Sequence, residues 1–108
     1  MANIFKNAIL SGVGVTAANV YIAPTGNTSI CIELDVCNTT SSTVSANVII
    51  RKGAGGSAFI IKSAPIPTGS ALQVIAGQKI VLESGDYLQV QSDTAASIDA
   101  VASILQDV

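Results

Sequence analysis

The sequence contains no histidine and no tryptophan, and it has only two cysteines among its 108 residues. Without histidine, a serine or cysteine nucleophile would need a lysine or a carboxylate as its base. The lysines are Lys6, Lys52, Lys62 and Lys79, and none completes a Ser-x-x-Lys arrangement. Two cysteines without histidine also fall short of a zinc site. We therefore expect a protein that is not an enzyme and that uses no cofactor and no metal.

Charge is also scarce, because charged residues make up 11% of the chain where about 25% is usual. The formal net charge of −2 argues against a protein that binds nucleic acid by neutralising phosphates. Hydrophobic residues reach 49%, which excludes disorder. No apolar run approaches the roughly 18 residues of a membrane helix. We expect one folded domain over residues 1–108, with neither nucleic acid nor membrane as a partner.

A surface with so few charges is typical of a protein covered by other protein, because a soluble monomer normally carries more charge. We therefore expect a homo-oligomer or a component of a lattice. The opening residues 1–6 hold one cation and no apolar block, so we expect no secretory leader there. We also expect both chain ends to be ordered by their neighbours.

Cys31 and Cys37 lie on one candidate strand, where six residues span about 20 Å. A disulfide needs Cα atoms within about 7 Å, so we expect two free thiols and a reducing place of synthesis. With Glu33 beside it on the same face, Cys31 is a poor nucleophile candidate, because a nearby negative charge raises a thiol pKa.

Hydrophobic side chains alternate with a period of two along most of the chain, which is typical of half-buried strands. In residues 29–38, one expected face holds Ile30, Ile32, Leu34 and Val36, and the other holds Cys31, Glu33, Asp35 and Cys37. Residues 44–51 alternate in the same way. The turn-forming composition of residues 38–42 between them predicts an antiparallel hairpin.

Further strands are expected at residues 57–63, 71–75, 79–83, 87–92 and 98–105, with weaker candidates at 5–10 and 19–23. Pro65 and Pro67 cannot donate to a ladder, so residues 64–69 are expected at a sheet edge or in a connection. No segment keeps a helical period. We predict an all-β, single-domain, two-sheet antiparallel sandwich of the jelly-roll type, with an immunoglobulin-like sandwich as second choice.

Two groups of residues suggest chemistry, and each has a simpler interpretation. Glu33 and Asp35 lie about 7 Å apart on a strand, as a glycosidase pair could, but an acidic surface patch is the expected interpretation. The glycine-rich residues 53–56 lack the Lys-Ser step of a phosphate loop. They predict a flexible hairpin tip, and the adjacent Arg51 and Lys52 a charged sheet edge. The acidic residues near turns show no calcium-loop spacing; they are Glu83, Asp86, Asp93 and Asp99.

Four short motifs, taken in order, resemble small virion proteins of tailed bacteriophages. They are Ile-Leu-Ser-Gly-Val-Gly at residues 9–14, Val-Cys-Asn-Thr-Thr at 36–40, Ala-Pro-Ile-Pro-Thr-Gly-Ser-Ala-Leu at 64–72, and Leu-Glu-Ser-Gly-Asp at 82–86 before the strand at 87–90. The resemblance implies a non-enzymatic structural protein with a β-sandwich or jelly-roll fold. Its first implied role is capsid decoration, as a cement protein that stabilises the head lattice through multivalent contacts.

The resemblance also implies partners and a location. The partners are the major capsid protein and further copies of the chain, with a trimer favoured, and the location is the virion after synthesis in the host cytoplasm. A tail, neck or fibre-base protein of the same fold is the alternative. A carbohydrate-binding module is more distant, because the chain has few aromatic residues for stacking on sugars.

Ile4 and Phe5 are the interface candidates. They belong to the segment from Ala2 to Asn7, which could be an extended arm that joins a neighbouring protein. Residues 1–12 could equally form the first strand of the sandwich.

Overall fold

The computed structural model describes residues 4–106, and these form eight strands and no helix. The strands are β1 (Ile4–Val13), β2 (Ala18–Ile22), β3 (Ser29–Asn38), β4 (Val44–Arg51), β5 (Ser57–Ile66), β6 (Ala71–Leu82), β7 (Tyr87–Ser92) and β8 (Ile98–Gln106). Among the described residues there is thus no helix that could cross a membrane. The expectation of ordered chain ends concerns residues 1–3 and 107–108, which lie outside this range.

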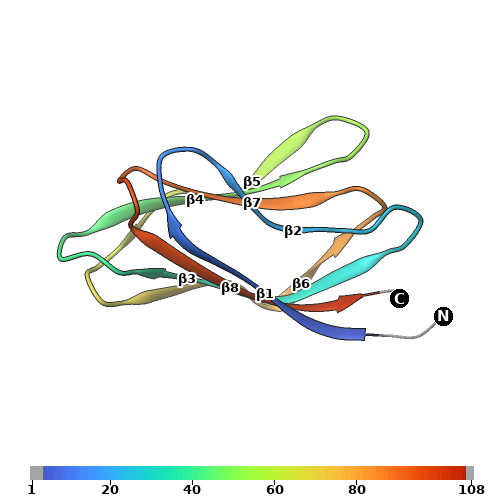
Figure 1. The fold of residues 1–108 in the computed structure, drawn as a ribbon, viewed down its shortest axis with the longest axis horizontal. Coiled ribbons are helices and arrows are strands. Elements are labelled where there is room, and N and C mark those ends of the chain that lie inside the picture. The colour runs from blue at the N-terminus through green and yellow to red at the C-terminus, as the bar shows by residue number, and fades with distance from the viewer. Residues whose placement is uncertain (1–3, 107–108) are drawn as a thin grey trace.

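The strands form two four-stranded antiparallel sheets that face each other (Figure 1). Sheet A has the order β1-β8-β3-β6, and sheet B has the order β2-β7-β4-β5. The first strand pairs with the last, the second with the seventh, the third with the sixth and the fourth with the fifth. This arrangement is one long antiparallel hairpin rolled into two layers, which is the eight-stranded jelly roll. The predicted fold class is confirmed.

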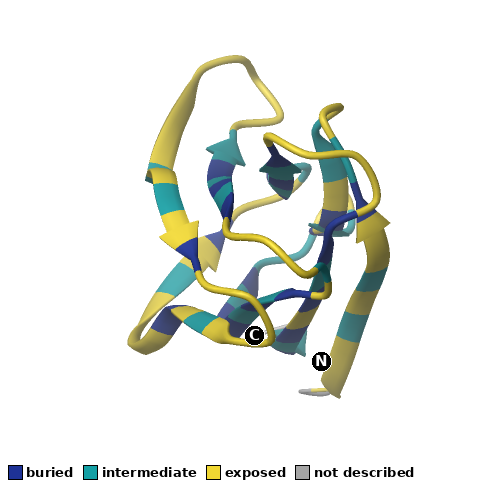
Figure 2. Ribbon diagram, turned by 90° about the vertical axis from the view of Figure 1, so that its left-hand side faces the viewer, coloured by how far each residue is buried: buried dark blue, intermediate teal, exposed yellow. Residues whose placement is uncertain are grey.

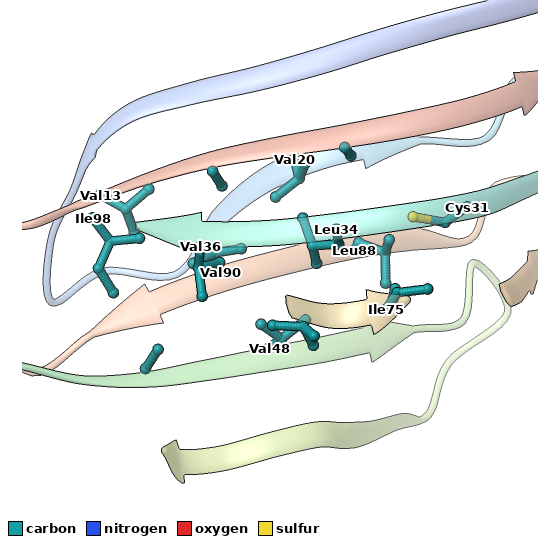
Figure 3. Packing of buried hydrophobic residues seen from close by; sticks show 14 of the residues in the cluster. Val13, Val20, Cys31, Leu34, Val36, Val48, Ile75, Leu88, Val90 and Ile98 are labelled. Carbon is teal, nitrogen blue, oxygen red and sulfur yellow. The ribbon is translucent and has the colours of Figure 1, made fainter. Parts of the chain in front are cut away.

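The core lies between the sheets because every strand sends alternate side chains inward. In β8, the four inward side chains are completely buried; they are Ile98, Ala100, Ala102 and Ile104. Facing residues from both sheets, including Leu34, Val48 and Leu88, meet in the middle (Figure 3). Aliphatic side chains dominate this cluster, as expected for a chain with so few aromatics.

Four sequence-based expectations about strands are wrong. Strands β3 and β4 do not form a hairpin, because the chain crosses from sheet A to sheet B between them. β6 is one irregular strand rather than two, with positive φ at Gly77 and Lys79. β5 extends beyond the expected residues 57–63 to Ile66. The expectation that Pro65 lies at a sheet edge is confirmed, because β5 is an edge strand. Arg51 lies on β4, which is paired on both sides and is therefore no sheet edge.

A bulge in β3 changes which side chains share a face. The register of β3 shifts between Cys31 and Glu33, so Ile32 is an extra residue in the strand. Cys31 therefore points into the core with Leu34, whereas Ile30 shares the outer face with Glu33. The expected face made of Ile30, Ile32, Leu34 and Val36 is wrong for its first half. A strict period of two cannot reveal a bulge.

The N-terminal segment is part of sheet A in the structure. Residues 4–10 pair with β8 in continuous register, from Ile4 opposite Gln106 to Leu10 opposite Ala100. β1 is an edge strand, with β8 on one side and no neighbour on the other. Ala2 and Asn3 of the candidate arm lie outside the described residues.

Two turns at one end of the sandwich are joined by Asp86, which is 2% exposed. Its carboxylate accepts hydrogen bonds from the Lys52 ammonium and from the backbone N–H groups of Gly53 and Glu83. Its own carbonyl accepts from the N–H of Ala23, at the end of β2. The β4–β5 turn, the β6–β7 turn and β2 are thus fixed to one another, and the expected flexible tip at residues 53–56 is anchored at its base.

Gly53 allows these two turns to approach closely. A Cβ at this position would lie 2.9 Å from the carbonyl carbon and oxygen of Gly85. We expect Gly53→Ala to lower the free energy of unfolding by about 1–3 kcal/mol, since backbone must shift to relieve the clash. Urea denaturation followed by circular dichroism measures this change. Ala54→Ser in the same exposed turn is the control, and an equal effect of both substitutions would contradict the close-approach explanation.

Candidate interaction surface

The outer face of sheet A carries a row of apolar side chains that crosses all four strands. Phe5 lies opposite Leu105, Leu105 opposite Ile30, and Ile30 opposite Val81. Four residues further along β1, Ile9 also points outward and lies opposite Val101. Directly opposite residues in antiparallel strands point to the same side of a sheet. The row therefore forms one surface, which we call the A face.

The A face is exposed to an extent that is unusual for large apolar side chains. Phe5 is 78% exposed, Ile9 67%, Val81 57% and Val101 48%. β1, the strand that starts beside the N label in Figure 2, is exposed along most of its length. Asn7, Ser103 and Glu33 lie between the row of Phe5 and the pair formed by Ile9 and Val101. Exposed apolar side chains that gather on one face in this way mark sites where a protein binds another molecule.

Acidic side chains flank the apolar row on the same face. Glu33 lies opposite Ser103, Asp35 opposite Val101, and Asp99 opposite Cys37. One carboxylate oxygen of Asp99 accepts a hydrogen bond from the N–H of Gly12 at 2.9 Å. Oδ1 of Asp35 is covered by its neighbours and has no hydrogen-bond partner among the described residues. The A face is thus apolar and acidic, as the expectation of an acidic surface patch at Glu33 and Asp35 requires.

The two interface candidates from the sequence occupy different positions. Phe5 points outward at the edge of the A face, in line with Leu105. Ile4 is its neighbour along β1, opposite Gln106, and is 41% exposed. Sequence reasoning missed the rest of the row, which comes from β3, β6 and β8. The available signal was the presence of apolar residues at several positions where a solvated strand would be polar, but the register of the strands is needed to use it.

Both cysteines are free, and Cys31 is buried. Burial raises the pKa of the Cys31 thiol to about 11, and a hydrogen bond from its Sγ to the carbonyl of Glu33 opposes this only in part. The expected direction of the shift is confirmed. The expected cause is wrong, because the Glu33 side chain lies on the opposite face. Cys37 is half-buried on the outer side of sheet A.

The described residues hold no group of three or more potential metal ligands and enclose no pocket. Of the acidic residues near turns, Asp86 is bound to Lys52, and Asp93 accepts a hydrogen bond from the N–H of Ser45. Glu83 forms an exposed ion pair with Lys52 at 2.7 Å. The candidate functional site of this structure is therefore an interaction surface, the A face.

Comparison with solved structures finds a similar fold in a pilus and in virus particles. A chain from Bacillus endospore appendages, described as disulfide-linked pili, superposes with a TM-score of 0.58 over 98% of this chain and 88% of its own, at 14% identity. A chain from the T13 particle of infectious bursal disease virus gives 0.52 at 12% identity, and one from the Gx strain gives 0.52 at 10%. These matches cover 98% and 96% of this chain.

The chain spans about a third of the two viral chains, 36% and 33%, but most of the appendage chain. No model of a protein family and no curated protein matches the sequence. At identities this low, the likeness establishes the fold alone. The chain is an eight-stranded jelly roll of the kind that also occurs in a pilus and in virus particles.

Proposed function

We propose that this protein is a non-enzymatic structural subunit of a virion, with capsid decoration as its first role. The observation that carries the proposal is the A face, a surface of exposed apolar side chains on a chain with few charges. A face of this kind is stabilised when another protein covers it. The fold neighbours, a pilus and virus particles, support a role in assembly.

The major capsid protein is the proposed partner of a decoration protein, together with further copies of the chain. A lattice offers many equivalent sites, so a contact that is weak at one site becomes strong through repetition. A single sheet face of moderate area suits this kind of binding. Within the A face, Phe5 is the most exposed large apolar side chain. It is the first residue we assign to a contact with another protein, either the capsid protein or a further copy of the chain.

A tail, neck or fibre-base position is the second candidate. The similarity to a pilus subunit over nearly its whole length favours it. A subunit of a fibre makes its main contacts with copies of itself, whereas a decoration protein makes them with the capsid protein.

Quantitative mass spectrometry of purified particles from the phage that encodes the chain tests both positions. We expect a ratio to the major capsid protein of order one for a decoration protein, and a small fraction of that ratio for a tail, neck or fibre protein. Complete absence from the particles would overturn the proposed function. The major tail protein, measured in the same digest, is the internal control for the low-copy range.

A further inference from the structure

The outer face of sheet B differs from the A face in the sign of its charge. Ile22 lies opposite Tyr87, and Tyr87 opposite Arg51. On the neighbouring strand the Lys62 ammonium lies 5.3 Å from the centre of the Phe59 ring. Ile22 and Phe59 are 52% and 51% exposed. We call this surface the B face; it is partly apolar and basic.

The two faces differ in the charges at their paired outward positions. Two lysines also lie on strands of sheet A, but Lys6 is opposite the inward Ile104 and Lys79 has no partner in the ladder. The paired outward positions of sheet A contain three carboxylates, Glu33, Asp35 and Asp99, and no cation. The paired outward positions of sheet B contain Arg51 and no carboxylate. With Lys62 over Phe59, the B face has two cations against the three carboxylates of the A face. Complementary potentials of this kind select partners and fix their orientation.

We propose that the A face of one copy binds the B face of a second copy. The inference rests on the proposed structural role and names the contact between copies. Exposed apolar side chains lie on both surfaces, so the contact buries Phe5 and Val101 against a face that holds Ile22 and Phe59. The carboxylates of the A face then lie against the basic B face of the second copy.

The area of the two faces is sufficient for a weak specific contact. Four strands at about 4.8 Å and eight residues at about 3.3 Å give a footprint of about 500 Å² for each face. Both partners together then bury about 1,000 Å², the lower limit of a specific interface. One contact is therefore weak, and repeated contacts are needed for a stable assembly.

The position of the faces determines the form of the assembly. They are the two outer surfaces of a two-layer sandwich and so point in opposite directions (Figure 1). A contact between unlike surfaces is heterologous, and it gives an open series unless a rotation closes it. We infer a stacked row of copies, in contrast to the trimer that the sequence resemblance favoured.

Two blocked variants test this contact by sedimentation velocity. Val81→Lys with Val101→Lys places cations on the A face, and Ile22→Glu with Lys62→Glu removes apolar surface and reverses a charge on the B face. The wild type should show a mean mass that rises between about 10 µM and about 1 mM, a range suited to weak contacts. Each blocked variant alone should remain at the monomer mass of 10.9 kDa, because its association should be at least tenfold weaker than that of the wild type. A 1:1 mixture of the two variants should associate, because the intact B face of one variant can bind the intact A face of the other.

The outcomes that overturn the contact are specific. A wild type that stays monomeric would overturn the proposed contact. A B-face variant that associates alone as strongly as the wild type would also overturn it, because that result indicates a symmetrical contact between two A faces. Val15→Lys, an equally exposed valine in the loop between β1 and β2, is the control and should leave association unchanged. Circular dichroism melting checks that all variants are folded. The particle measurement remains independent: presence in virions without stacking overturns only this inference, and stacking with absence from virions overturns only the proposed function.

Discussion

Replacing Asn38 with aspartate is expected to be the most damaging single-atom change in the core. The Asn38 side chain is fully buried, and its Nδ2 donates to the carbonyls of Ser42 and Ile66 at 2.7 and 2.8 Å. Its Oδ1 accepts from both the N–H and the hydroxyl of Thr40. Asn38→Asp removes both donors and places a negative oxygen against two carbonyl oxygens. We expect the free energy of unfolding to fall by about 3–5 kcal/mol at neutral pH.

Urea denaturation monitored by circular dichroism measures this loss. The matched control is Asn47→Asp, the same substitution at a half-buried position of β4, where Nδ2 donates to Gln91 and solvent is near. Its cost should remain near 1 kcal/mol, the net value of an ordinary hydrogen bond. Equal losses in the two variants would show that the buried turn of Asn38 has no special role.

Asp86→Asn is expected to lower the free energy of unfolding, because it removes the charge of a buried carboxylate that binds a cation. Burial by itself raises the pKa of Asp86. Hydrogen bonds from Lys52 and from the N–H groups of Gly53 and Glu83 lower the pKa by more than burial raises it, so the pKa lies below its usual value. The amide keeps some of these contacts and loses the charge. We expect a loss of about 2–4 kcal/mol at pH 7.

The pH dependence of this effect has a defined sign. Because the pKa of Asp86 is lower in the folded state, its charged form stabilises the fold above about pH 4, the usual pKa of a free aspartate. This stabilisation is lost as the pH falls through the folded-state pKa. The difference between wild type and Asp86→Asn should therefore shrink below about pH 4 in urea denaturation at a series of pH values.

Glu83→Gln is the control for Asp86→Asn, since Glu83 binds the same ammonium but is exposed. An exposed ion pair contributes little, so we expect a change within about 0.5 kcal/mol. A difference between wild type and Asp86→Asn that stays constant from pH 7 to pH 2 would contradict the ionic explanation.

The motifs at residues 36–40, 64–72 and 82–86 gain a structural explanation from these contacts. Asn38 lies in the first and bonds to Ile66 in the second, while Asp86 ends the third. Both polar side chains are buried at turns, where backbone groups need partners that the sheets do not provide. These three motifs therefore maintain the fold, and they contribute none of the large exposed apolar residues of the A face. Ile9, which lies on the A face, belongs to the fourth motif at residues 9–14.

The bounds of several strands were predictable from the alternation of apolar residues. β3, β4 and β7 have the expected bounds, although the bulge in β3 breaks its alternation. The sequence did not predict the pairing of strands, since the turn at residues 38–42 could serve a hairpin or a crossing between sheets. The long β6 was divided at Gly77, where a positive φ bends the strand without ending it.

The A face could not be predicted from the sequence for a related reason. Its apolar row takes one residue from each of four strands, and only the register of the strands aligns them. These residues are Phe5, Leu105, Ile30 and Val81. In addition, the bulge at Ile32 turns Ile30 outward, although the simple alternation predicts it in the core. The low charge of the chain did indicate that protein covers part of its surface, but it could not indicate where.

The pairing of β1 with β8 also constrains how the chain acquires its structure in the cell. Ribosomes add about 5–20 residues per second, so β1 emerges several seconds before β8, its hydrogen-bonding partner. During that interval the apolar strand β1 and half of sheet A remain incomplete. Pairings between distant segments form slowly because loop closure precedes them. Sheet A can therefore be completed only after β8 has left the ribosome, and until then β1 lacks its hydrogen-bonding partner.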